Sequence, residues 1–205
     1  MKLGSPADLR RRFRTGRACL DLVHTGGEGA LARWEIVHGP DDLGRLLGAI
    51  LGLPALPADE ADLAAMRPLR AAMTRIAYGL AAGEPAGEPT AIDRIVHELA
   101  AGAPRPADIA AINAAAAAPP LVPALRTDGS GTTVVDPTAA AALATIARDA
   151  VDLFGGSLAH RIRVCSAEDC GLLFVDTSRP GRRRWCSMQR CGNRAKIRTH
   201  RARRA

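Results

Sequence analysis

Apolar residues recur at helical spacing along most of the chain before Gly155. Between residues 59 and 82 they return every three or four positions, which predicts a long helix with one apolar face. The same spacing predicts further helices at about residues 43–50, 90–101, 106–118 and 137–154. The apolar segment 18–23 is too short to be assigned to a helix or a strand. This part of the chain is therefore predicted to be mainly α-helical.

Local signals indicate where two of these helices begin. Asp41 or Asp42 is expected to cap the first, because a short acidic side chain accepts hydrogen bonds from the free N–H groups of a first turn. Asp136-Pro137 is expected to open the last, since proline is favourable at the first helical position. Alanine dominates the apolar residues and aromatic residues make up only 3% of the chain, so closely packed helices are expected.

Two segments are predicted to form β-hairpins. Short apolar runs on both sides of a glycine-rich turn predict the first hairpin within residues 121–135. Nearer the C-terminus, strands at 171–176 and 182–186 are expected to form the second. Phe174 and Trp185, one on each of these strands, are expected to pack together as a small core. A base-stacking role is the alternative for Trp185.

Charge divides the chain into two parts. Residues 161–205 hold thirteen Lys and Arg against three acids, a net charge of +10, whereas residues 1–160 hold fifteen against eighteen and carry −3. Gly155-Gly156 lies close to this change, so two domains are predicted, a helical one at 1–156 and a small basic one at 157–205. A basic domain of this kind indicates a polyanionic partner.

Four of the five cysteines have the spacing of a zinc site. The pattern Cys-x4-Cys-x15-Cys-x4-Cys places Cys165, Cys170, Cys186 and Cys191 in two pairs, and two such pairs converge on one tetrahedral ion. Four thiolates leave no position for water or substrate, so one structural Zn²⁺ is expected rather than a catalytic one. Oxidation of the thiolates with loss of the metal would make the same site a redox switch. Cys19 is expected to be a small core residue.

Arginines dominate the residues that follow the third cysteine. Ser187 is expected to cap a helix that runs to about Arg204 and carries a stripe of arginines on one face. Arginine binds phosphate and guanine edges bidentately, so such a helix suits the major groove of DNA. The nucleic-acid-binding residues predicted from this helix and from the basic strip before it are Arg182, Arg183, Arg184, Arg190, Asn193, Arg194, Lys196, Arg198, Arg201 and Arg204. A solvated basic tail and an acidic protein partner are the alternatives.

The C-terminal motifs resemble a known family of zinc-binding domains. The string Cys191-Gly192-Asn193-Arg194 and its flanks, together with Cys165-x4-Cys170-Gly171 and Phe174-Val175-Asp176-x-Ser178, are similar to the CGNR zinc finger. In that family the finger follows a helical ABATE domain, and the proteins are described as stress-induced transcription regulators. The segment from Gly16 to Thr25 resembles the opening of ABATE domains, although Leu22 replaces an aromatic residue and His24 an asparagine. The resemblance implies regulation of transcription in a stress response.

Polar residues in the same N-terminal segment are candidates for a ligand pocket. Asp21, His24 and Thr25 form this predicted pocket, and helix capping with core hydrogen bonds is their alternative role. A hydrolytic enzyme that uses His24, His38 or His97 is not expected, because no spacing of nucleophile and base supports one.

The leading hypothesis is a mainly α protein in which a multihelical domain with a small β-hairpin precedes a zinc ribbon and a basic helix. The zinc domain is expected to bind double-stranded DNA, while the helical domain senses an unknown small ligand or mediates homodimerisation. The alternative is a zinc-stabilised adaptor that binds RNA or protein with the same basic face. The sequence shows no signal peptide and no apolar run long enough for a membrane span, so a bacterial cytoplasmic protein is expected, associated with the nucleoid when bound to DNA.

Overall fold

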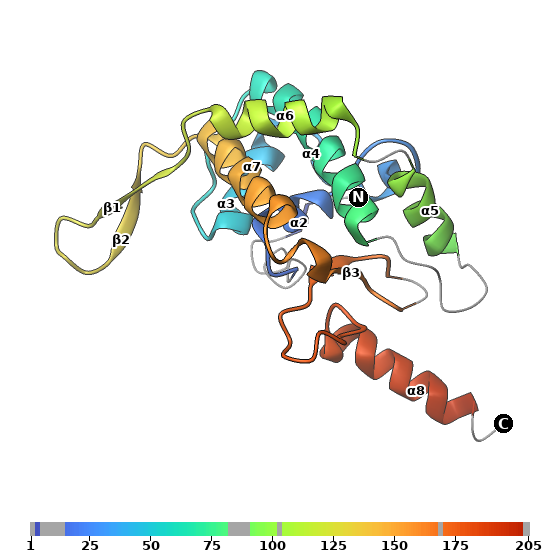
Figure 1. Ribbon diagram of the computed structural model, residues 1–205. Helices are drawn as coiled ribbons and strands as arrows, with labels where there is room; N and C mark the ends of the chain where they lie inside the picture. Colours follow the sequence, from blue (N-terminus) through green and yellow to red (C-terminus); the bar gives the residue numbers. More distant parts are fainter. Residues whose placement is uncertain (1–2, 5–14, 82–90, 102–103, 168–169, 203–205) are drawn as a thin grey trace.

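The computed structural model describes residues 3–4, 15–81, 91–101, 104–167 and 170–202. Within these residues the chain is mainly helical, as the apolar spacing predicts, and includes two small antiparallel hairpins (Figure 1). The helices are α2 (Ala18–Val23), α3 (Pro40–Leu51), α4 (Glu60–Ala81), α5 (Ala91–Ala100), α6 (Pro106–Ala117), α7 (Ala139–Gly155) and α8 (Asn193–Ala202). The same residues include three short helical turns, which are the 3₁₀ turns η1 (Gly29–Trp34) and η2 (Ala159–Arg161) and the π turn η3 (Met188–Gly192). The strands are β1 (Val122–Leu125), β2 (Thr132–Val135), β3 (Ile162–Val164) and β4 (Leu173–Val175).

Helix α4 is the centre of the helical body, and α2, α5, α6 and α7 all pack against it. Its apolar face is buried, with Met66 and Met73 fully so. Helix α7 presents a row of small side chains, because Ala142, Ala147 and Ala150 are all completely buried. Such small residues allow helix axes to approach closely, so the predicted alanine-based packing is confirmed in the body.

The starts of two helices differ from the predictions. Helix α3 begins at Pro40, one position before the predicted cap, and Asp42 accepts a hydrogen bond from His38 N at 3.1 Å from within the first turn. Proline can occupy this first turn because its missing N–H would have no partner there. Helix α7 begins at Ala139 rather than at Pro137, and the Thr138 hydroxyl caps it by accepting a hydrogen bond from Ala141 N.

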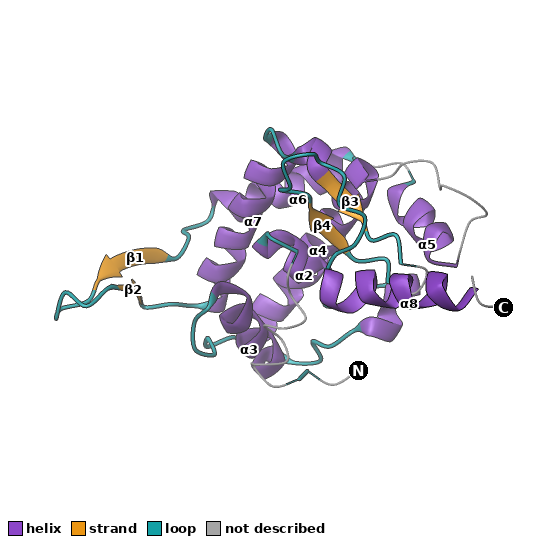
Figure 2. Ribbon diagram, turned by 90° about the horizontal axis from the view of Figure 1, so that it is seen from below, coloured by secondary structure: helices purple, strands orange, loops and turns teal. Residues whose placement is uncertain are grey.

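The predicted hairpin between α6 and α7 is present. Strands β1 and β2 pair antiparallel from Val122 with Val135 to Leu125 with Thr132. The hairpin extends away from the helices in both views of the ribbon (Figures 1 and 2). It is exposed on both faces, and Leu125 keeps 79% of its surface accessible.

The C-terminal hairpin is built from other strands than the predicted ones. Strand β4 pairs with β3, so that Ile162 lies opposite Val175, and the segment 182–186 is not a strand. Ile162 and Val175 are both buried, whereas three consecutive arginines at 182–184 would place a cation on the buried face of a strand. The alternation in Ile162-Arg163-Val164 was the sequence signal for β3.

Strand β4 separates two apolar cores. Leu173 and Val175 belong to the core of the helical body, together with Ile162 of β3. Phe174, between them in the sequence, points to the other side and packs with three of the four zinc-site cysteines. Successive side chains of a strand point to opposite faces, so one short strand completes both cores.

None of the helices in the described parts of the chain combines the length and the apolar composition that a membrane crossing requires.

Candidate metal centre and nucleic-acid interface

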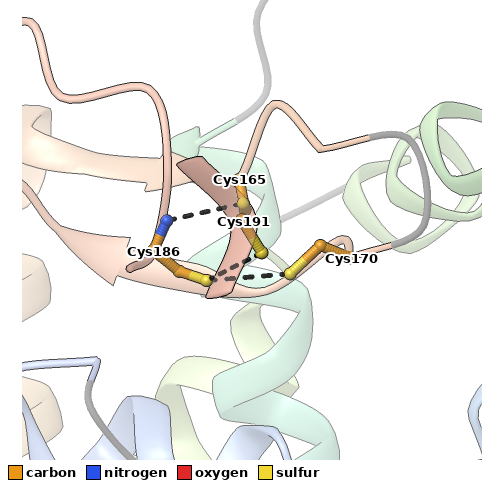
Figure 3. A group of neighbouring side chains, drawn as sticks. All are labelled: Cys165, Cys170, Cys186 and Cys191. Atoms are coloured by element: carbon orange, nitrogen blue, oxygen red, sulfur yellow. Dashed lines mark hydrogen bonds between the residues drawn. The ribbon is translucent and has the colours of Figure 1, made fainter. Parts of the chain in front are cut away.

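The four predicted zinc ligands converge in the folded chain. Their Sγ atoms all lie within 4.8 Å of one another (Figure 3). Cys186 Sγ lies 3.6 Å from Cys191 Sγ and 3.7 Å from Cys170 Sγ. Cys165 follows β3, Cys170 precedes β4, and the other pair brackets the start of η3. The two pairs come from distant turns, as the Cys-x4-Cys spacing predicts.

The electrostatics of this cluster favour a bound cation. Hydrogen bonds from its neighbours, Cys170 first, lower the pKa of Cys165, so one thiolate forms readily. Hydrogen bonding to Cys165 raises the pKa of Cys170 and Cys186, and burial and repulsion between neighbouring thiolates act in the same direction. A divalent ion removes this penalty and holds all four sulfurs as thiolates. The site therefore fits one structural Zn²⁺ with a closed shell of four cysteines.

Groups around the sulfurs support the ligand geometry. The backbone N–H of Cys186 donates to Cys165 Sγ at 3.4 Å, and the guanidinium of Arg194 donates to Cys191 Sγ at 3.6 Å. Donors of this kind orient thiolate ligands and offset their charge. Arg194 therefore lies beside the metal centre and is also exposed at the start of α8.

The small core beside the metal contains the two predicted aromatic residues. Phe174 is fully buried, and Trp185 is half-buried and packs against the same cluster. The guanidinium of Arg183 lies over the Phe174 ring at 4.6 Å, and that of Arg184 lies over the Trp185 ring at 5.3 Å. The packing that the sequence predicts for Phe174 and Trp185 is confirmed, although they do not lie on paired strands.

A buried carboxylate, which the sequence reasoning did not select, organises the loop between the cysteine pairs. Asp176 is completely buried and accepts hydrogen bonds from Ser178 N, Ser178 Oγ and Arg183 N at 2.9, 2.6 and 2.9 Å. Burial opposes its ionisation, but these hydrogen bonds hold the pKa of Asp176 below its usual range. The Asp-x-Ser spacing was the available signal, since it is typical of a side chain that closes its own turn.

The ten predicted nucleic-acid-binding residues differ in how available they are. Arg182, Arg184, Asn193, Arg194 and Lys196 are exposed. The side chains of Arg190, Arg198 and Arg201 and the whole of Arg204 lie outside the described residues. Arg183 is only half-buried, but its guanidinium donates to the carbonyl oxygens of Trp185 and Cys186, which gives it a structural role. Arg179, which was not predicted, is exposed in the Asp176 loop.

The three residues of the predicted ligand pocket form separate hydrogen bonds within the protein. Asp21 accepts from the Thr15 hydroxyl at 2.7 Å. His24 accepts from Leu173 N at 2.8 Å through Nε2. Thr25 is buried, donates to Leu22 O at 2.7 Å and accepts from Arg70 at 2.9 Å. These contacts correspond to the alternative role of capping and core hydrogen bonding.

One of these contacts belongs to a seam between the helical body and the zinc module, here defined as residues 157–202. His24 bonds the backbone of β4, and Tyr78 on α4 donates to Gly171 O at 3.0 Å. Val175 N also donates to Thr15 O at 3.0 Å. Gly171 directly follows the metal ligand Cys170, so α4 is bonded to the backbone at the metal centre.

Two family models match the chain and define the class of protein. The model of the ABATE family, described as “Putative stress-induced transcription regulator”, matches residues 16–157, and that of the CGNR zinc finger matches residues 161–204. The ABATE match covers more than half of the 205 residues, so the chain belongs to the ABATE family. Both matches confirm the resemblance seen in the sequence motifs. No curated protein matches the chain.

Proposed function

We propose that this protein is a DNA-binding transcription regulator in which the zinc module contacts double-stranded DNA and the helical body controls that contact. In this proposal the protein binds DNA rather than catalysing a reaction, and its zinc ion is structural, since a shell of four thiolates offers no open coordination position. A protein that binds DNA in a bacterial cell is cytoplasmic and associates with the nucleoid when bound.

The observation that carries this proposal is the exposed positive charge around the metal centre. Arg182 and Arg184 lie on the segment that leads into the third ligand, and Arg194 and Lys196 lie on the first turn of α8 after the fourth. Residues 161–205 keep a charge near +8 when a zinc–thiolate site of −2 is included. Cations held on a rigid, metal-bound frame can match the spacing of backbone phosphates.

The position of α8 supports a role in groove binding. The helix lies at the edge of the molecule farthest from α6, with its C-terminal end directed outward (Figure 1). Its exposed residues include Ile197, which keeps 52% of its surface accessible and offers an apolar contact for a thymine methyl group. A helix that begins at a metal ligand and carries cations fits the width of a major groove.

The proposal can be tested by measuring affinity against salt concentration. The zinc-loaded protein is titrated with a 30-bp duplex DNA, an RNA hairpin and an acidic peptide between 50 and 300 mM salt. Duplex DNA is expected to bind most tightly, with a steep log–log salt dependence. The slope should fall by about 1 in each of Arg182→Gln and Lys196→Gln. Arg45→Gln is the matched control, because Arg45 is exposed on α3, outside the zinc module and the β1–β2 hairpin.

Equal loss of affinity in Arg45→Gln would contradict an interface at the zinc module. Tighter binding to RNA or to the acidic peptide than to duplex DNA would replace the proposal with the adaptor function.

For the helical body, we propose two roles: it senses a ligand, and it mediates dimerisation through the β1–β2 hairpin. A lone two-stranded hairpin is only marginally stable, yet this one exposes Leu125 and, among the described strands, β1 and β2 pair only with each other. The same hairpin of a second copy can pair along an edge across a two-fold axis. Sedimentation equilibrium should show a dimer that Leu125→Asp weakens at least tenfold and Thr133→Asp, on the opposite face, does not. A wild-type monomer at 100 µM would contradict this role.

A further inference from the structure

A cavity of about 320 Å³ opens between α4, α5 and the segment that follows α2. Helix α4 contributes one face of its middle part, with side chains at i, i+3, i+4 and i+7 starting from Arg67. Leu99 of α5 contributes an apolar wall, as does Leu31 of η1. The volume lies at the small end of the range for ligand sites, which suits a compact organic molecule.

Arg70 is the most strongly held charged residue of this cavity. Its side chain is 4% exposed and donates to Glu35 at 3.0 Å through Nη1 and at 2.5 Å through Nη2. Gly26 makes this pairing possible, since it adopts a φ of +128° and a Cβ there would lie 2.4 Å from Glu35 Cα. The Thr25-Gly26 turn therefore brings Glu35 against α4 without a steric clash.

One hydrogen-bond donor in this arrangement has no acceptor. Among the described residues, Arg70 Nε is the one buried side-chain nitrogen or oxygen for which the structure shows no partner. Buried donors are nearly always satisfied, so an orphan beside a cavity indicates a missing acceptor. A water or an oxygen-bearing ligand could supply it.

The other charges of the cavity favour an anionic group near Arg67. Arg75 is paired with Asp108 at 2.5 Å, and Glu35 is held by Arg70. Arg67 is exposed at the cavity and forms no ion pair within the described chain. Glu28 also lines the cavity and interacts electrostatically with Arg75. Arg67 and Arg70 lie three residues apart on one helix face. The guanidinium of Arg67 and the Nε–H of Arg70 are therefore the donors available to the oxygen atoms of a ligand.

We propose that this cavity binds a small organic carboxylate whose charged group meets Arg67 and Arg70 and whose apolar part lies against Leu31, Ala71 and Leu99. The inference deepens the ligand-sensing role proposed for the body, and its cavity lies next to the predicted pocket residue Thr25, which Arg70 contacts. Arginine suits a carboxylate because its planar group donates hydrogen bonds in parallel.

The same residues connect the cavity to the zinc module. Arg70 Nη1 donates to Thr25 Oγ1, and the adjacent His24 is bonded to the backbone of β4. Tyr78, about two turns after Arg70 on α4, is bonded to Gly171 next to a metal ligand. A ligand that repositions Arg70 therefore acts on two contacts of the seam.

Calorimetric titration of the zinc-loaded full chain, without DNA, tests the site directly. The probes are benzoate, hexanoate and 3-phenylpropanoate, each compared with its uncharged amide. At least one carboxylate should bind with a Kd tighter than about 10 mM, and its amide should bind at least about tenfold more weakly. Because DNA is absent, failure of the DNA-binding proposal would leave this result unaffected.

Three variants locate the binding. Arg67→Gln should weaken carboxylate binding by about three- to tenfold, and Ala71→Leu, which fills the cavity without changing charge, should abolish it. Arg45→Gln removes the same charge from the exposed surface of α3, away from the cavity, and should bind like the wild type. The proposal is overturned if none of the three carboxylates saturates below about 10 mM, if the amides bind equally well, or if Arg67→Gln and Ala71→Leu bind normally. Thermal melts of each variant confirm that it is folded.

Discussion

The helical body and the zinc module are stabilised by different means. The body encloses a continuous apolar core that draws on six helices, and residues 1–160 carry a slightly negative charge. The core of the zinc module has five buried residues, three of which are metal ligands, under a surface of strong positive charge. A segment this small cannot bury enough apolar surface to fold by itself. The metal supplies the missing stability and leaves the surface free to carry cations.

The division between the two regions is nevertheless incomplete. Strand β4 contributes Leu173 and Val175 to the body and Phe174 to the module, and Tyr78 of α4 is bonded to the module backbone. The two regions therefore have separate sources of stability but share one strand. Zinc removal, substitutions in β4, a change of pH and the loss of one hydroxyl should have effects of decreasing size. Together they measure how far the stability of each region depends on the other.

Loss of zinc should have the largest effect and should affect mainly the module. Zinc binding contributes an apparent 10–16 kcal/mol in small zinc-finger peptides, roughly the whole stability of such a unit. Removal of zinc with a chelator, or the Cys186→Ser change, should therefore unfold the module while α2 to α7 retain most of their helical circular dichroism. In a Trp34→Phe background Trp185 is the single tryptophan, and its emission should shift to the red.

Cys19→Ser is the control for this experiment. Cys19 is fully buried in the body, and burial raises the pKa of its thiol, so it stays protonated and far from metal chemistry. The variant should keep one zinc per chain. Complete loss of helical signal on chelation of the wild type would show instead that the body depends on the metal as well.

Two neighbouring substitutions in β4 should separate the two cores. Phe174→Ala should cost about 3–5 kcal/mol and lower the affinity for zinc, because it empties the core of the module. Leu173→Ala should cost about 2–5 kcal/mol and lower the melting temperature of the body, while zinc affinity changes little. Chelator competition and thermal melts give the two readouts. Identical profiles for both variants would mean that the cores unfold as one.

Strand β4 also illustrates what the sequence can and cannot predict. The four cysteines were predictable because zinc needs particular ligands at short spacings, and such spacings can be read directly from the sequence. The partner of β4 was not predictable in the same way, since both β3 and the segment 182–186 lie close in sequence. The choice depends on which segment can bury Ile162 against the helical body, and such a tertiary contact is invisible to local patterns.

The candidate ligand site shows the same limit. Arg67 and Arg70 are ordinary polar positions on the long helix that the sequence predicts, and their spacing alone indicates nothing. Only the fold shows that Arg70 is buried and paired with Glu35 across a glycine turn. Only the fold also shows that its Nε–H has no hydrogen-bond acceptor. By contrast Asp21, His24 and Thr25 were singled out from a motif, and the fold uses them for internal hydrogen bonds.

A buried acid gives the body a pH dependence that the module does not share. Burial raises the pKa of Asp21 to about 6, although hydrogen bonds from Thr15 act in the opposite direction. The folded state thus holds this proton more tightly than the unfolded state, so the free energy of unfolding should fall as pH rises from about 4 to 6. The loss amounts to about 2–3 kcal/mol and should disappear in Asp21→Asn. Urea unfolding at pH 4, 5, 6 and 7 measures it, and parallel curves for both proteins would contradict the assignment.

The smallest effect concerns the seam itself. Tyr78→Phe removes one hydroxyl and leaves Gly171 O without its partner, which should cost about 1–1.5 kcal/mol. Because the ring keeps its place in the body core, the loss should appear as faster amide hydrogen exchange in β4 and around Gly171, with little change in α6 and α7. Uniform acceleration throughout the body would show that Tyr78 serves the body core alone. A local change confined to the module side would establish that α4 holds the backbone beside the metal, which is one of the two contacts through which a signal from the cavity can reach the module.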